Sequence, residues 1–150
     1  MIRTVVNVLG VLFILAGLAG FASHHMMDMN LSTTHNIIHL ITGVLALWFG
    51  LKGTDRGVRN FARTVGVIYG LLGLIGFFFG PDTLTLKSLS GLAESHVWKL
   101  IPGHLELGTA DDVVHLVAGI IFLIVGFIPR SAELRAERAA TETKEKVTPR

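Results

Sequence analysis

Histidine has the most versatile side-chain chemistry in this sequence. The histidines are not spread evenly but lie on one side of the predicted apolar segments. The seven histidines fall outside the apolar segments of the chain or in the outer part of one: His24, His25, His35, His39, His96, His104 and His115. Imidazole suits metal, haem or proton chemistry near neutral pH. A functional site is therefore to be sought on the histidine-bearing side of the molecule.

The first candidates are His39 and His115, each about one turn inside an apolar segment. Polar residues in membrane helices usually face the bundle interior and often mark function. The pair could bind a cofactor as a bis-histidine haem site or a metal site, or could serve as a proton relay. The sequence favours a simpler interpretation, in which each imidazole bridges two helices through hydrogen bonds.

Asn36 and Asp112 precede these histidines by three positions. An acidic residue and a histidine at this spacing can ligate one metal ion in a helical bundle. Thr33 and Thr109, three residues earlier still, instead indicate helix N-caps followed by a polar residue at the third helical position. We therefore interpret Asn36 and Asp112 as a structural polar pair at two helix starts, with metal ligation as the alternative.

A second candidate metal site is a short segment rich in methionine and histidine. Three of the four methionines lie there beside two histidines: His24, His25, Met26, Met27 and Met29. Thioether and imidazole ligands together favour copper, but methionine also serves as a pliable apolar anchor at an interface. The sequence favours the anchor, and overall it favours no bound cofactor, with haem or copper as the alternatives.

The elements that must position these residues are long apolar segments. Hydrophobic residues make up 51% of the chain and charged residues 16%, against about 25% charged in an average soluble domain. A bilayer core needs roughly 17 to 25 apolar residues as helix. Stretches at about 4–22, 35–51, 64–80 and 110–129 meet this length. The predicted fold is an all-α bundle of four transmembrane helices in one domain, 1–129, embedded in the lipid bilayer.

The sequence also contains an internal repeat. Segment 10–21 matches segment 66–77 in its glycines and leucines, and segment 36–50 matches segment 112–126, histidine included. Two matches in the same order indicate duplication of a helical hairpin, with copies at about 4–51 and 64–129. Each copy crosses the membrane twice, so the repeats are parallel and place both histidines at one depth. The recurring glycines indicate close helix packing.

The distribution of basic residues predicts the orientation. All lysines and arginines except Lys87 and Lys99 lie near the termini or between the second and third segments. By the positive-inside rule, both termini are cytoplasmic and 130–150 is a charged cytoplasmic tail. This pattern accounts for the basic residues without nucleic-acid binding. A cleaved signal peptide is the alternative for the first segment, but its partner in the repeat favours a retained helix.

The second outer loop, 81–109, carries a further pattern. Its apolar residues between 84 and 101 recur near helical spacing, with Trp98 among them. We expect a short amphipathic helix in the outer interface, where tryptophan lies at headgroup level.

The element Asn36-x-x-His39-Leu40-x-x-Gly43 resembles a bacterial four-helix integral membrane family, domain of unknown function 4383. So does the stretch from Ile101–Pro102 to His115-Leu116-x-x-Gly119. The similarity would cover 1–129. It implies the fold and a place in the bacterial cytoplasmic membrane, and it implies no catalytic residues.

Motifs of enzymes are missing from the sequence: it has no phosphate-binding loop, nucleophile elbow, HExxH or dinucleotide fingerprint. We therefore expect a structural or accessory protein that packs against itself or a larger membrane complex. The alternative function is a haem- or copper-binding membrane protein.

Overall fold

The computed structural model describes residues 1–23, 25–26, 29–79, 97–102, 104–129, 134–135 and 138–140. Among these residues, four helices are long and apolar enough to cross a membrane: α1 (Ile2–Ala22), α2 (Thr33–Lys52), α3 (Asp55–Phe79) and α4 (Thr109–Phe127). The protein is therefore an all-α four-helix bundle, as predicted. The main difference is that α3 begins at Asp55 rather than near residue 64, so Arg56, Arg59 and Arg63 lie on its first turns.

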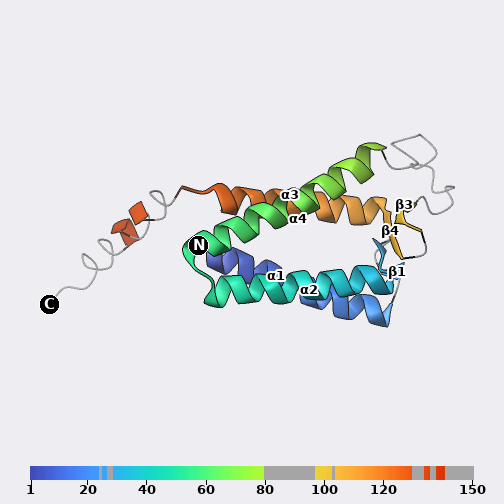
Figure 1. Ribbon diagram of the computed structural model, residues 1–150, viewed down its shortest axis with the longest axis horizontal. Helices are drawn as coiled ribbons and strands as arrows, with labels where there is room; N and C mark the ends of the chain where they lie inside the picture. Colours follow the sequence, from blue (N-terminus) through green and yellow to red (C-terminus); the bar gives the residue numbers. More distant parts are fainter. Residues whose placement is uncertain are drawn as a thin grey trace.

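Two small antiparallel sheets lie together at one end of the bundle, which we call the strand end (Figure 1). One pairs β1 (His25–Met26) with β2 (Met29–Asn30), and the other pairs β3 (Val97–Ile101) with β4 (Leu105–Gly108). The amphipathic helix expected between 84 and 101 is wrong for its described part, because Val97–Ile101 is a strand. The rest of that segment lies outside the described residues.

The helices pack as two hairpins, α1 along α2 and α3 along α4 (Figure 1). Glycine makes the close approach within each hairpin feasible. A Cβ at Gly43 would lie 2.7 Å from the backbone oxygen of Gly10, and one at Gly119 would lie 2.9 Å from that of Gly66. In lipid, helices gain stability from such tight van der Waals contact, because the acyl chains are already apolar.

Arginine side chains form hydrogen bonds between helices at the opposite end of the bundle, which we call the basic end. Arg3 of α1 donates hydrogen bonds to the backbone oxygens of Gly50 (3.1 Å) and Gly53 (2.8 Å), where α2 ends. Arg63 of α3 donates to Gly126 (2.9 Å), where α4 ends, and Arg59 donates to Ile128 just beyond it. The last carbonyls of a helix lack intrahelical partners, and cations suit this end of its dipole. The start of α3 at Asp55 places both arginines on this helix, within reach of the end of α4.

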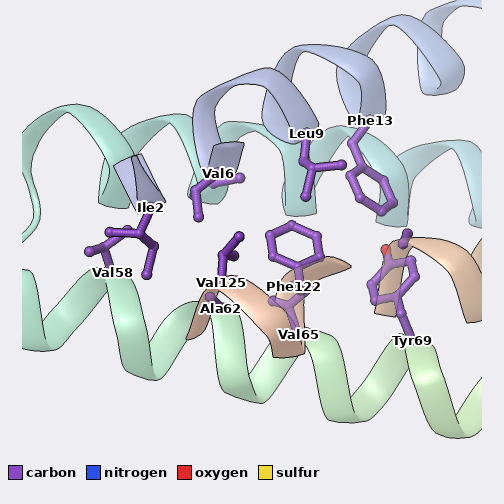
Figure 2. Packing of buried hydrophobic residues seen from close by; sticks show 12 residues of the cluster. Ile2, Val6, Leu9, Phe13, Val58, Ala62, Val65, Tyr69, Phe122 and Val125 are labelled. Carbon is purple, nitrogen blue, oxygen red and sulfur yellow. The ribbon is translucent and has the colours of Figure 1, made fainter. Parts of the chain in front are cut away.

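The hydrophobic core lies between the two hairpins. Figure 2 shows Phe13 and the other buried residues of α1 facing side chains from α3 and α4. Phe122 of α4 is fully buried, and its ring centroid lies 6.2 Å from those of Phe13 and Phe61. The outward faces carry exposed large apolar side chains such as Val44 and Ile124. Such a surface suits contact with lipid rather than water.

Candidate metal centre

Three histidines meet inside the bundle near the strand end. His35 and His39 come from α2 and His115 comes from α4, and they are 2%, 4% and 3% exposed. Their ring centroids lie 4.4 Å apart for His35 and His39, 5.3 Å for His35 and His115, and 5.9 Å for His39 and His115. One ring nitrogen from each lies within 4.8 Å of the others. We call this group the histidine cluster.

Local sequence explains why two members lie on one helix face. Positions four apart on a helix are neighbours on its surface, so His35 lies one turn before His39. His35 itself sits in the first turn of α2, where its backbone N–H donates to the Ser32 hydroxyl, 3.3 Å away. The internal repeat pairs His39 with His115, and the structure brings these two together. His35 is a third member that was not predicted, although its spacing of four residues from His39 was a usable signal.

Asp111 is a second residue beside the cluster that was not predicted as part of a site. It lies one turn before His115 and is 1% exposed. Its Oδ2 accepts hydrogen bonds from the backbone N–H groups of Asn30 (2.9 Å) and Gly108 (2.8 Å). Its Oδ1 lies 3.9 Å from His35 Nδ1. Asp111 therefore connects the starts of the two helices that carry the histidines and places a carboxylate beside the cluster.

Hydrogen bonding fixes which nitrogen of His35 faces the cluster. Its Nδ1 lies 3.0 Å from the backbone oxygen of Asn30. A carbonyl oxygen only accepts, so Nδ1 carries the hydrogen and the Nε2 of the neutral ring has a lone pair that can accept a hydrogen bond or bind an ion. That Nε2 lies 3.3 Å from His115 Nε2. A backbone carbonyl bound to one ring nitrogen is the usual way in which proteins orient a metal-ligating histidine.

The remaining nitrogens of the cluster lack partners within the described part of the chain. His39 has no hydrogen bond at either ring nitrogen, and His115 has none at Nδ1. Buried polar groups are normally paired, and an exception calls for a specific explanation such as an ion or ligand. The sequence favoured interhelical hydrogen bonds for both His39 and His115. Such a bond joins His115 to His35, but His39 makes none within the described residues.

The separation of the two facing nitrogens suits one ion. At the usual metal–nitrogen distance of about 2.0–2.1 Å, two ligands on one ion lie about 2.9 Å apart at a right angle and about 3.3 Å apart at the tetrahedral angle. The Nε2 atoms of His35 and His115 are 3.3 Å apart. His39 is the third imidazole of the cluster, with a ring nitrogen within 4.8 Å of those of the other two.

Asn36 and Asp112 are both buried but lie apart from the cluster. They face the partner helix within each hairpin: a Cβ at Gly20 would overlap the Asn36 side chain, and one at Gly76 would overlap Asp112. The Asn36 amide also donates to the Leu31 backbone oxygen at 3.1 Å. Their interpretation as a structural polar pair stays a prediction.

The predicted N-caps of these helices were one residue late. Ser32 and Gly108 occupy the N-cap positions, rather than Thr33 and Thr109. The third helical positions therefore fall to His35 and Asp111. The reason is that the Ser32 hydroxyl and the Asp111 carboxylate are the groups that reach the free backbone N–H groups.

The methionine-rich segment falls mostly outside the description. His24 and Met27 are not among the described residues, and for His25 and Met26 only the backbone of β1 is described. Met29 is half-buried in β2. Copper binding by this segment stays a prediction.

Comparison with known proteins places the chain in a family. Curated proteins and solved structures give no match. The family model described as domain of unknown function 4383 matches residues 3–98. The resemblance drawn from the sequence extended to residue 129, and its part beyond residue 98 stays a prediction. Since the match spans more than half of the protein, the chain belongs to the family of domain of unknown function 4383.

Proposed function

We propose that this protein is a membrane-embedded metal-binding protein that holds one copper ion in the histidine cluster. The observation that carries the proposal is the set of three buried imidazoles with ring nitrogens within 4.8 Å of one another, of which His39 has no hydrogen bond among the described residues. Imidazole suits copper, zinc, iron and nickel, and the Irving–Williams order favours divalent copper among them.

The surroundings of the cluster supply what a buried cation needs. A charge is costly in an apolar interior unless a counter-charge lies nearby. The Asp111 carboxylate lies beside His35, and the Asn30 carbonyl orients the same ring. These two groups would balance part of the ion's charge and hold one ligand in position, as outer-shell partners of metal sites do.

A copper ion fits this cluster better than haem does. A porphyrin held by His39 and His115 would lie between their rings, which are 5.9 Å apart at their centroids. His35 occupies that region, with its centroid 4.4 Å and 5.3 Å from the two. Haem binding would therefore require His35 to leave the cluster.

Elemental analysis of purified protein tests the proposal. The protein should carry an affinity tag other than polyhistidine, which binds copper itself. After incubation with copper and gel filtration, we expect about one ion per chain. His39→Gln and His115→Gln should each lower copper retention at least tenfold. His104→Gln is the matched control, because His104 is exposed and lies outside the cluster.

A further variant separates metal binding from helix bridging. Asp111→Asn leaves the three imidazoles in place, and we expect copper affinity to fall about 10- to 100-fold through loss of the outer-shell charge. Circular dichroism and gel filtration show whether each variant is folded. Folded wild-type protein that retains no copper, or cluster variants that retain as much as His104→Gln, would overturn the proposal.

The accessory role in a larger membrane complex, or in self-association, stays a second prediction. Its motivation was the glycine-lined helix faces. Apart from Gly57, the described glycines of the helices pack inside the hairpins, as Gly43 and Gly119 do, and so contribute to the internal fold rather than to an outer surface. We therefore place metal binding ahead of it.

We also propose that the hairpins arose by duplication. Support comes from matching contacts: Gly10 meets Gly43 in one hairpin as Gly66 meets Gly119 in the other. Basic residues at the basic end support a cytoplasmic location of that end in a bacterial cytoplasmic membrane, with one membrane domain at 1–129 followed by the tail. Reporter fusions at the two termini would test this orientation, and an active periplasmic reporter at either one would contradict it.

A further inference from the structure

A pocket of about 320 Å³ lies at the basic end, between the first turns of α3 and the end of α4. Arg56, Arg59 and Arg63 line it from α3, and Phe127, the last residue of α4, lies among them. Beyond Arg63, α3 has no further Lys, Arg, Asp or Glu. The pocket therefore lies at the border between the apolar part of the bundle and water, at the level of lipid head groups.

Positive charge dominates the lining of this pocket. Its three arginines accompany one acidic residue, Asp55, whose Oδ1 already pairs with Arg3 of α1 at 2.9 Å. Arg59 and Arg63 donate to backbone oxygens near the end of α4, and these partners are neutral. Both guanidinium groups therefore keep their positive charge, and the pocket favours an anion.

N–H donors remain available for such an anion. Arg56 is exposed, and within the described residues its side chain makes no hydrogen bond or ion pair. A guanidinium has five N–H donors, and in the described part of the chain Arg63 uses only its Nε–H, toward Gly126. The Phe127 ring centroid lies 4.6 Å from the central carbon of the Arg63 guanidinium, and this cation–π contact orients the group. Arg56 and Arg63 can thus both donate to one oxyanion.

We propose that this pocket binds a phosphate group, and that an anionic phospholipid of the surrounding bilayer supplies it. Arginine recognises phosphate through paired N–H···O bonds, and basic pockets between membrane helices bind anionic head groups. The lining also has an apolar part, in which the Phe127 side chain is 62% exposed. An acyl chain would cover this ring while the phosphate contacts the arginines. Free phosphate would leave the ring uncovered, so a phospholipid matches the lining better.

The proposal goes beyond copper binding and does not rest on it. The histidine cluster lies near the strand end, and none of its residues lines this pocket. The inference also holds for either orientation of the chain, because both leaflets of a bilayer present head groups at this depth.

Lipid binding to the full chain in a neutral detergent tests this inference, measured by native mass spectrometry at an ionic strength of about 0.15 M. The probes are phosphatidylglycerol and phosphatidylcholine with the same acyl chains, of which only the first is a net anion. We expect phosphatidylglycerol to bind at least about tenfold tighter, and equal binding would overturn the proposal. Millimolar inorganic phosphate should leave this binding unchanged. Displacement of the lipid by the free ion would overturn the phospholipid as the source of the phosphate.

Arg56→Gln tests the charged part of the pocket. It should weaken phosphatidylglycerol binding at least about tenfold, and the bundle should stay folded because this side chain has no partner among the described residues. Lys52→Gln is the matched control: Lys52 is exposed at the same end of the bundle, on α2, and does not line the pocket. Screening by salt should limit its effect to about threefold. Equal losses would show a diffuse attraction to the basic end and overturn the site.

Asn60→Phe separates shape from charge. Asn60 is exposed and lines the pocket, so phenylalanine there fills space without changing any charge. We expect at least about tenfold weaker phosphatidylglycerol binding. Thr64→Phe, one turn further along α3 and outside the lining, should bind the lipid like the wild type. If folded Asn60→Phe binds it as tightly as Thr64→Phe does, the proposed site is wrong.

Copper content measured on the same samples keeps the two proposals distinguishable. Arg56→Gln and Asn60→Phe should lose lipid binding and retain copper, since neither residue belongs to the histidine cluster. Selective phosphatidylglycerol binding without copper in the wild type would overturn the metal proposal alone, and copper without selective lipid binding would overturn this one alone.

Discussion

Replacement of Phe122 by alanine tests how this core is stabilised. The Phe122 side chain is fully buried between the hairpins, with Phe13 beside it (Figure 2). The Phe61 ring also lies beside it, 6.2 Å away between centroids. In a water-soluble core, the change costs about 3–5 kcal/mol, from lost transfer free energy and from the cavity. In a bilayer the transfer contribution largely vanishes, because lipid is as apolar as the core. A cavity of about 100 Å³ at about 24 cal/mol/Å³ leaves a cost of about 2 kcal/mol.

The free energy of unfolding can be measured by titrating sodium dodecyl sulfate into protein held in a mild detergent, with helicity followed by circular dichroism. Phe78→Ala is the control: Phe78 is 55% exposed on α3, so its loss should change stability by no more than about 0.5 kcal/mol. A loss of about 4 kcal/mol or more for Phe122→Ala would refute the absence of a transfer contribution. A loss equal to that of the control would refute the central place of Phe122.

Three further changes test the packing of the helices by the same assay. Arg3→Met removes hydrogen bonds to two carbonyls at the end of α2 and should cost about 1 kcal/mol; an unchanged midpoint would contradict this capping. Gly73→Ala places a Cβ against the backbone of α4 and should cost about 2 kcal/mol, whereas at Gly70 the nearest atom would be 4.0 Å away and alanine should be tolerated. Reversal of that order would be inconsistent with the described packing. Thr42→Val and Tyr69→Phe remove a 3.0 Å hydrogen bond between α2 and α3, so a double-mutant cycle should give a coupling of about 0.6 kcal/mol, and additive effects would show that the bond contributes nothing.

Much of this architecture could be predicted from local patterns. Apolar segments of sufficient length determine membrane helices, because the backbone must satisfy its own hydrogen bonds in lipid. Glycines such as Gly43 and Gly119 indicated close helix contacts, and both do lie at contacts within the hairpins. The extent of α3 could not be predicted in this way. By their charge, Arg59 and Arg63 were expected in or beside a loop. Both instead lie on α3 and donate to carbonyls at the end of α4, which are distant in sequence.

The sequence by itself determined the four membrane helices, the membership of His39 and His115 in one polar site, and the helical spacing that places His35 beside His39. These properties depend on composition and on periodicity along one helix. Only the tertiary structure decided that His35 and Asp111 approach each other across the two hairpins, and that the His39 ring lies buried in the histidine cluster without a hydrogen-bond partner in the described residues. The physical reason is that these contacts depend on how the two hairpins pack together, and neither the periodicity of one helix nor its composition sets that packing.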